Sequence, residues 1–313
     1  MKAAVVSAFD TPPRYTDFPT PAPTGRHELL VDVLACGLHP RVRSQADGSH
    51  YTSTGDLPLV PGIDGVGRDP DGALRYFVLP DTPMGAMAER TVIDARRSVL
   101  LPPDTDPIAV AAGVNPALSS WLALRRRIEF PAGATVLVLG ATGNAGRLAI
   151  QVACHLGAGR VVAAGRDPDR LAGLAALGAD VAVLVGSGGF GGAAADVDVV
   201  LDYLWGDPAV AAMVAIVTDR PDRGRALRWV QIGSVAGPTA AVPSAVLRAS
   251  GLQIVGSGQG SVPTGDILAE LPALAREITA GTFAVDAEAM ALADVERAWA
   301  IAGRTARRIV LVP

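Results

Sequence analysis

Three glycines lie where an apolar run meets a helix-like pattern, in the stretch ATVLVLGATGNAGRLAIQVACHLGA. Backbone amides at the start of a helix bind anions, and glycine lets a phosphate approach the main chain. The spacing GxxGxxG departs from GxGxxG, but an apolar strand precedes it, and a helix and a second strand, RVVAAG, follow. The turn therefore predicts nucleotide binding rather than a tight corner in the core, through Gly140, Ala141, Thr142, Gly143, Asn144 and Ala145.

The end of the second strand indicates which nucleotide binds. An NAD site needs a carboxylate there for the ribose 2′-hydroxyl, whereas an NADP site needs cations for the 2′-phosphate. The strand ends at Gly165-Arg166, and Arg170 follows one helical turn later, so two guanidiniums can converge on one phosphate. Asp167 is either the ribose-binding acid or the N-cap of the next helix, with Pro168 in its first turn. We favour NADPH, with a solvated helix face as the alternative for the two arginines.

The surrounding pattern supplies the elements that must position this turn. Strand-sized apolar runs alternate with helix-sized segments from residue 106 onward: TVLVLG, GRVVAAG, DVAVLV, VDVVLDYL, ALRWVQIG and LQIVGSG. This alternation predicts an α/β fold with a doubly wound parallel sheet. Residues 1–105 combine short period-two runs with many prolines, which predicts an irregular β-rich domain. The last 50 or so residues offer two helices and a closing strand that can pack on that first domain.

Composition restricts the partners. The formal net charge is −4 and no basic block is present, which argues against nucleic acid and anionic membranes as partners. No apolar run reaches the roughly 18 residues of a membrane helix, and MKAAVVSAFDTPPRY does not resemble a signal peptide, so we expect a cytoplasmic protein with no membrane partner. The chain has only two cysteines, Cys36 and Cys154, far apart and without a CxxC motif, which excludes a four-Cys zinc site. Cys154 is expected in the core.

Over nearly its whole length the chain resembles the zinc-free quinone oxidoreductase branch of the medium-chain dehydrogenase/reductase superfamily. The matching segments, in order, are MKAAVV, ACGLHPRVRSQADGSHY, LPLVPGIDGVG, GAMAERTVI, NPALSSWLAL, VLVLGATGNAGRLAIQVA, VVLDYLWG, QIGSVAG, GLQIVGSGQGS and RRIVLVP. The resemblance implies a Rossmann domain, residues 116–257, inserted in a GroES-like β-rich catalytic domain, residues 1–115 and 258–313. It also implies a homodimer, and a cofactor and a substrate bound between the two domains.

The resemblance also bears on metal chemistry. Zinc-dependent relatives carry a catalytic Cys where this chain has His39, and Gly-His-Glu where it has Gly62-Ile63-Asp64. Ile63 has no lone pair for a metal, and a catalytic zinc needs three well-placed ligands, so we expect none. Without a Lewis acid, the acceptor that fits is a quinone or another conjugated carbonyl, whose reduction gives a weakly basic phenolate or an enolate.

Several residues are candidates for substrate or cofactor contacts. Tyr51 and His39 are the main catalytic candidates, and His50 and Tyr76 are weaker ones. A structural hydrogen bond is the alternative role for each. His39 stands where many quinone reductases carry Asn, and this departure leaves its role open. Further cofactor contacts follow from position: Asn115 where the domains join, and the strand ends Ile232, Gly233, Ser234, Ser257 and Gly258.

Several residue assignments and two other functions remain open. Trp205 either stacks near the ribose or only packs, and the run Arg125–Arg127 is expected to face solvent. An enoyl-thioester reductase would share the mechanism but needs a basic channel, which we do not find in the sequence. A non-catalytic NADPH-binding protein, structural or redox-sensing, would keep the same glycine turn. The leading hypothesis is a zinc-independent NADPH-dependent reductase of quinones or enones.

Overall fold

The computed structural model describes residues 1–305 and 307–313 and divides into two compact units. The first comprises Met1–Asn115 and Leu271–Pro313, and the second comprises Pro116–Glu270. The chain leaves the first unit after Asn115 and re-enters it at Leu271, whereas the sequence predicted a return at residue 258. The sequence pattern marks the end of the last parallel strand, whereas helix α8 (Thr264–Thr279) continues across the point of return.

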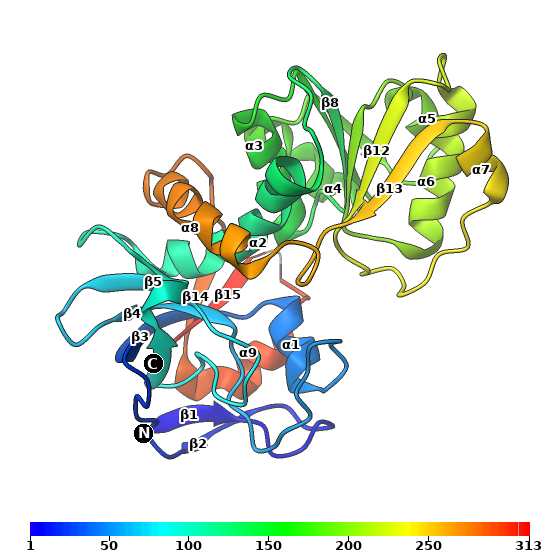
Figure 1. The fold of residues 1–313 in the computed structure, drawn as a ribbon. Helices are drawn as coiled ribbons and strands as arrows, with labels where there is room; N and C mark the ends of the chain where they lie inside the picture. Colours follow the sequence, from blue (N-terminus) through cyan, green and yellow to red (C-terminus); the bar gives the residue numbers. More distant parts are fainter. Residues whose placement is uncertain (306) are drawn as a thin grey trace. The chain divides into compact units, whose positions relative to one another are not determined.

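The second unit is built around a parallel sheet in the order β10-β9-β8-β11-β12-β13. Helices α3 and α6 lie on opposite faces of this sheet (Figure 1), as the alternating strand and helix pattern predicted. Its strands are β8 (Thr135–Leu139), β9 (Arg160–Gly165), β10 (Val181–Leu184), β11 (Val199–Asp202), β12 (Ala226–Gln231) and β13 (Gly251–Gly256). Its helices are the π-helical η2 (Ala123–Arg127), α3 (Asn144–His155), α4 (Pro168–Ala172), the 3-10 turn η3 (Ala175–Leu177), α5 (Phe190–Ala193), α6 (Gly206–Asp219) and α7 (Ser244–Arg248).

The central strands of this sheet form because they bury side chains on both faces. Strands β8, β9 and β11 consist of valine, leucine and alanine with little else, and nearly every residue in them is buried. Such continuous apolar runs are typical of parallel strands covered by helices on both sides. The order of the strands reverses between β8 and β11, where successive crossovers turn in opposite directions along the sheet. In doubly wound sheets, ligands bind at the carboxyl edge beside this point.

The first unit is mainly antiparallel, and the C-terminal strands complete its sheet. The path is β14-β15-β3-β4-β5-β7, with β6 also paired to β3, and β1 pairs separately with β2. The elements are β1 (Lys2–Val5), β2 (Arg14–Asp17), β3 (Glu28–Gly37), α1 (Pro40–Ala46), β4 (Asp64–Arg68), β5 (Leu74–Val78), β6 (Arg90–Asp94), η1 (Ala95–Arg97), β7 (Ser98–Leu100), β14 (Ala287–Ala291), η4 (Leu292–Asp294), α9 (Val295–Ile301) and β15 (Arg308–Val312). The closing strand expected from RRIVLVP is β15.

Helix α2 (Pro107–Leu122) carries the chain from the first unit into the second. Together with η2 it forms the stretch Pro107–Arg127, which among the described residues is the one helix with the length and hydropathy of a membrane span. Of its most apolar window, 61% is buried inside the protein. Core helices of soluble proteins share this composition, so the stretch is weak support for a membrane span.

Candidate functional site

The glycine turn lies between β8 and α3, where the sequence placed it. Gly140 has a φ of +84°, a conformation that side chains other than glycine rarely adopt. A Cβ on Gly146 would overlap the carbonyl oxygen of Gly140 and lie 2.7 Å from the Cα of Ala141. Helix α3 therefore starts directly against the turn only because residue 146 has no side chain.

The start of α3 has backbone donors without a side-chain cap. Its N-cap residue is Gly143, which has no side chain to accept a hydrogen bond from the first amides. The first N–H groups of any helix lack partners within the helix, and capping oxygens or ligands satisfy them. On the other side of the turn, the N–H groups of Gly140 and Ala141 both donate to the carbonyl of Ala164, at 3.0 Å. The turn is fixed to the sheet while the helix start remains available to an anion.

The end of β9 approaches the same turn. A Cβ on Gly165, the last residue of the strand, would lie 2.9 Å from the Cγ2 of Thr142. Arg166 follows it, and the side chains of Arg166 and Arg170 are exposed. Within the described part of the chain, neither guanidinium forms an ion pair. Two exposed cations therefore lie beside the strand end where a ribose phosphate would be recognised.

Asp167 is the N-cap of helix α4. Its Oδ1 accepts hydrogen bonds from the backbone N–H groups of Asp169 and Arg170, at 3.1 and 3.2 Å, and Pro168 lies in the first turn. Of the two roles that the sequence left open for Asp167, the structure shows the cap. The carboxylate is oriented by its own helix, which leaves Arg166 as the charged side chain directly after the strand.

The predicted contacts after β12 and β13 lie at the same edge of the sheet. The N–H groups of Ile232 and Gly233 donate to the carbonyl of Asp202, at 2.8 and 3.0 Å, and the N–H of Ser257 donates to the carbonyl of Gln231, at 2.8 Å. Ser234 and Gly258 continue these two loops. The second unit thus brings together every cofactor residue predicted between 140 and 258. Asn115, the last residue of the first unit, is half-buried within α2.

A buried carboxylate organises the loop after β11, a role that the sequence reading missed. Asp202 is fully buried, and its Oδ1 accepts hydrogen bonds from the N–H groups of Leu204, at 2.8 Å, and Trp205, at 3.0 Å. Its Oδ2 accepts one from the indole Nε1 of Trp229, at 2.9 Å. Burial raises the pKa of Asp202, although the three donors act in the opposite direction. An acid that directly ends an apolar strand is the sequence signal that could have indicated it.

Trp205 is held by this loop in an uncommon backbone conformation. Its φ of 52° and ψ of −164° make it the one residue other than glycine with positive φ in the described chain. Such a conformation costs a bulky residue on the order of 1–3 kcal/mol. Its indole is partly buried and packs against the apolar core of the second unit.

The catalytic candidate His39 lies in a buried hydrogen-bond chain of the first unit. Its Nε2 lies 3.0 Å from Oδ1 of Asp64, and the hydroxyl of Tyr76 donates to Oδ2 of Asp64 at 2.7 Å. All three side chains are buried. The structural hydrogen bond that we named as an alternative for His39 and Tyr76 is therefore present, and a catalytic role for His39 stays a prediction.

Burial favours the neutral forms of His39 and Tyr76. It lowers the pKa of His39, while the charge and hydrogen bond of Asp64 act in the opposite direction. It also raises the pKa of Tyr76 well above its ordinary value. A neutral imidazole that donates from Nε2 leaves Nδ1 as an acceptor, and this atom is buried without a hydrogen-bond partner among the described residues.

The other catalytic candidate, Tyr51, lies on an exposed loop. Its side chain is 73% exposed, and its ring stacks on His50 with the ring centroids 4.4 Å apart. The backbone N–H of Thr52 donates to Nδ1 of His50 at 3.2 Å, so this nitrogen is unprotonated. Burial and the nearby Arg41 lower the pKa of His50, which favours the same neutral form. The loop is thus ordered by local contacts that leave the tyrosine accessible.

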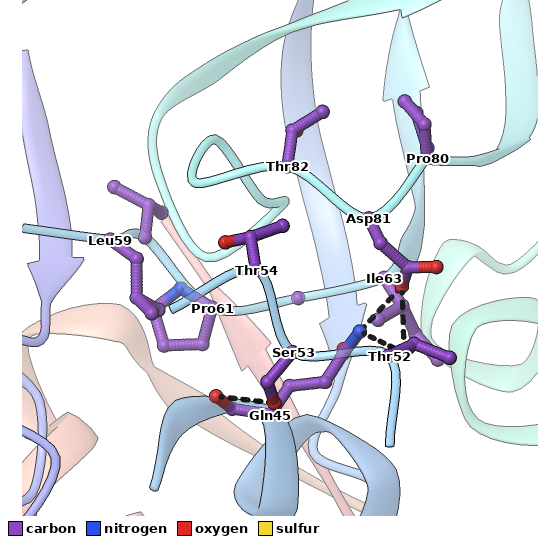
Figure 2. A pocket seen from close by; sticks show the side chains of 12 residues that line it. Gln45, Thr52, Ser53, Thr54, Leu59, Pro61, Ile63, Pro80, Asp81 and Thr82 are labelled. Carbon is purple, nitrogen blue, oxygen red and sulfur yellow. Dashed lines mark hydrogen bonds between the residues drawn. The ribbon is translucent and has the colours of Figure 1, made fainter. Parts of the chain in front are cut away.

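A small pocket, open to solvent, adjoins the Tyr51 loop (Figure 2). On one side of it, Oδ1 of Asp81 accepts hydrogen bonds from Gln45 Nε2 at 2.6 Å, Arg41 Nη2 at 2.8 Å and Thr52 Oγ1 at 3.2 Å. Figure 2 shows the side chains of Gln45, Thr52 and Asp81 converging, with Ile63 beside them. Asp81 therefore links helix α1 to the loop that carries Tyr51, a role that no sequence pattern indicated.

Arg125 and Arg126 are exposed, as expected of the run Arg125–Arg127, but all three arginines also bind other parts of the second unit. Arg125 and Arg126 bind the buried carboxylate of Glu270 at 2.8 and 2.7 Å, and Trp121 Nε1 donates to it at 2.8 Å. Arg127 donates to the carbonyls of Gly256 and Ser261, so it holds the loop with Ser257 and Gly258. Cys154 was placed wrongly, since it is exposed rather than in the core.

Comparison with known proteins identifies the family. No family model matches the chain. The probable NADPH-dependent quinone reductase tdiC of Emericella nidulans is 32% identical over 359 aligned positions, which cover 100% of this chain and 100% of that protein. The chain belongs to the quinone oxidoreductase branch of the medium-chain dehydrogenase/reductase family.

Solved structures and a further relative agree with this membership in the quinone oxidoreductase branch. The quinone oxidoreductase of Thermus thermophilus, solved alone and with NADPH, has a TM-score of 0.86 at 25% identity, and the match covers 100% of both chains. A probable oxidoreductase from Mycobacterium abscessus has a TM-score of 0.81 at 26% identity over 100% of this chain and 99% of that one. The chloroplastic NADPH-dependent alkenal/one oxidoreductase of Arabidopsis thaliana is 30% identical over 50% of this chain and 44% of its own.

The position that the resemblance equates with a zinc ligand is the apolar Ile63. Ile63 is buried in the core of the first unit. Asp64 beside it is engaged by His39 and Tyr76. Across residues 1–305 and 307–313, no three His, Cys, Asp or Glu side chains are grouped as a metal site would require.

Proposed function

We propose that this chain is an NADPH-dependent reductase that transfers hydride to a quinone or another conjugated carbonyl without zinc. The observation that carries the proposal is the strand end of β9. Arg166 is exposed directly after Gly165, while Asp167, the residue that could select NADH, caps helix α4. An NADP site needs cations at this place, and an NAD site needs a carboxylate.

The residues fit NADPH in two further respects. Helix α3 starts with amides that no side chain caps, and its N-cap Gly143 meets only one atom within 4 Å of a Cβ built on it. The pyrophosphate would bind these amides, and the 2′-phosphate would bind Arg166 and Arg170. Bound there, NADPH supplies a hydride from C4 of its nicotinamide ring.

The acceptor class follows from the side chains near Ile63. Hydride addition to a simple ketone produces an alkoxide, which normally needs a Lewis acid or a strong proton donor. The buried Ile63 offers no ligand, and Asp64 is committed to His39 and Tyr76. A quinone or enone needs only hydrogen-bond donors, because its charge is delocalised. We propose that Tyr51 orients the acceptor or protonates the reduced oxygen, and a catalytic role for the buried His39 stays a prediction.

The experiment is a spectrophotometric assay of NADPH and NADH oxidation with chelator-treated protein. The panel consists of several quinones, several enones and a crotonyl thioester. We expect quinones or enones to be reduced with NADPH in clear preference to NADH. Turnover of the thioester alone would indicate an enoyl-thioester reductase, and tight NADPH binding without any turnover would indicate a non-catalytic binding protein. Activity that returns only when zinc is added would contradict the metal-free mechanism.

We also propose that the protein is cytoplasmic and homodimeric. The parallel sheet ends in two strands, β10 and β13, that each have one neighbour within the sheet. An open strand edge can pair with the same edge of a second copy. Light scattering coupled to size-exclusion chromatography would give the mass in solution, and a mass of 32.0 kDa, that of one chain, would contradict the dimer.

A further inference from the structure

The side chain of Asp81 joins the antiparallel sheet of the first unit to the loop that carries Tyr51. Asp81 follows β5, and its segment is fixed to the chain before β4, because the N–H of Val60 donates to the carbonyl of Pro83 at 2.7 Å. The loop of residues 49–54 belongs to no helix or strand. A carboxylate held by the framework of the first unit therefore binds a loop that has no strand pairing of its own.

Three donors from two other elements meet at one oxygen of Asp81. Its Oδ1 accepts hydrogen bonds from Arg41 Nη2 at 2.8 Å and Gln45 Nε2 at 2.6 Å, both from helix α1, and from Thr52 Oγ1 at 3.2 Å. Gln45 Nε2 also donates to Thr52 Oγ1 at 3.2 Å, which closes the triangle of dashed lines in Figure 2. The side chains of Asp81 and Arg41 are half-buried, so their ion pair is screened less than one on the open surface. The sheet, the helix and the loop are thus joined at a single atom.

The contacts continue from Thr52 to the ring of Tyr51. The N–H of Thr52 donates to Nδ1 of His50 at 3.2 Å, and the N–H of Ser53 donates to the carbonyl of His50 at 2.9 Å. The ring of Tyr51 stacks on the imidazole of His50, with the centroids 4.4 Å apart. Since the side chain of Tyr51 is 73% exposed, no surrounding core fixes its direction. Its direction depends on the loop, and the loop is tied to the sheet through Asp81.

We propose that Asp81 is a positioning residue for the reduction, which holds the phenol of Tyr51 where it meets the acceptor. Asp81 acts through Thr52 and the loop rather than on the acceptor itself. The inference rests on the proposed function, in which Tyr51 orients the acceptor or protonates the reduced oxygen. Reacting groups need accurate placement, and a displacement of about 1 Å caused by a distant substitution can lower the rate about a hundredfold.

The test combines substitutions of Asp81 with removal of the phenol hydroxyl. Asp81→Ala and Asp81→Asn are made in the wild type and in Tyr51→Phe. Asp32→Ala is the matched control, because Asp32 also pairs with an arginine, Arg90, but on the exposed surface between β3 and β6. For each protein we measure kcat and KM with NADPH and a quinone that the wild type reduces, the dissociation constant of NADPH, and the amide hydrogen exchange of residues 49–54 by mass spectrometry.

We expect Asp81→Ala to lower kcat/KM for the quinone about tenfold to a hundredfold, with the NADPH dissociation constant within about twofold of the wild type. Exchange should become faster in residues 49–54. Asp81→Asn keeps an oxygen that can accept from Gln45 and Thr52, so its loss should be smaller. In the Tyr51→Phe background, Asp81→Ala should change kcat/KM by less than about twofold, because no hydroxyl remains to be positioned.

A general loss of stability would give a different pattern. Equal losses from Asp81→Ala in the two backgrounds, an equal loss in Asp32→Ala, or a parallel loss of NADPH affinity would overturn the positioning role, as would wild-type kcat/KM or unchanged exchange in Asp81→Ala. Tyr51→Phe with full activity would overturn it too, while leaving hydride transfer intact. If Asp81→Ala does not fold, the same comparisons are made with Asp81→Asn. A wild type that reduces no quinone or enone would overturn the proposed function itself, and the positioning role with it.

Discussion

Removing the charge of Arg166 tests the cofactor assignment most directly. The exposed guanidinium of Arg166 follows β9, and the neighbouring Asp167 caps helix α4. We expect Arg166→Ala to weaken NADPH binding and to leave NADH binding unchanged, because only NADPH carries the 2′-phosphate. The same reasoning applies to Arg170, which follows one helical turn later.

The size of the expected loss in NADPH affinity follows from the exposure of Arg166. A hydrogen bond to a charged group contributes about 1.5–3 kcal/mol, and the exposed position of Arg166 favours the lower end of that range. Since about 1.4 kcal/mol is a tenfold change in affinity, Arg166→Ala should raise the dissociation constant of NADPH about tenfold. The double variant with Arg170→Ala should raise it about a hundredfold, if the two contacts are independent.

The assay is titration of each variant with NADPH and with NADH, followed by nucleotide fluorescence. Arg248→Ala is the matched control, because Arg248 is an exposed arginine at the end of a short helix in the same unit. The NADPH affinity of the wild type should also fall as salt is raised, while that of the double variant should change less. Equal losses for NADPH and NADH, or a loss in the Arg248 variant as large as in Arg166→Ala, would refute the assignment.

Three further substitutions test the glycine turn, the buried His39 and the bonds that Trp121, Arg125 and Arg126 make to Glu270. Gly146→Ala forces a Cβ into the main chain of the glycine turn, so it should cost about 1–3 kcal/mol of unfolding free energy and abolish nucleotide binding, whereas Gly192→Ala has open space around it and should do neither. Burial lowers the pKa of His39 below the 6.5 of an unfolded chain, so as pH falls the unfolded state takes up the proton first, and the unfolding free energy should fall below about pH 6.5. Urea unfolding at pH 7.5 and pH 5.5 should show a smaller loss of unfolding free energy in His39→Asn than in the wild type. An equal loss in the two proteins would contradict this reasoning. Glu270→Gln leaves two half-exposed arginines without their carboxylate and should lower the unfolding free energy by about 2 kcal/mol, while Glu296→Gln, on an exposed helix face, should change it by less than about 0.5 kcal/mol.

The parallel sheet could be predicted because its signals are local. Each central strand is a short apolar run, and the glycines that form the turn are adjacent in the sequence. The cap on α4 was readable for the same reason, since Asp167 and Pro168 stand next to the helix that they start. Local sequence also placed the end of β9, on which the cofactor assignment depends.

The partners of charged side chains could not be predicted, because they come from distant segments. His39 meets Asp64 and Tyr76 only after β4 and β5 pair in register, and no short pattern encodes that contact. Arg125 and Arg126 look like part of a solvated run until Glu270 is brought to them from the other end of the unit. The backbone of Trp205 was likewise unreadable, since a residue type that disfavours positive φ gives no hint that it adopts one.

The bonds to Glu270 link the two ends of the second unit. Residues 116 and 270 are the two ends of that unit, and Glu270 binds Trp121, Arg125 and Arg126 close to the other end. The inserted segment thus closes its own loop with side chains that it carries itself. The two ends of the second unit are therefore linked by side chains of that unit alone, although both ends lie inside helices, α2 and α8, that continue into the first unit.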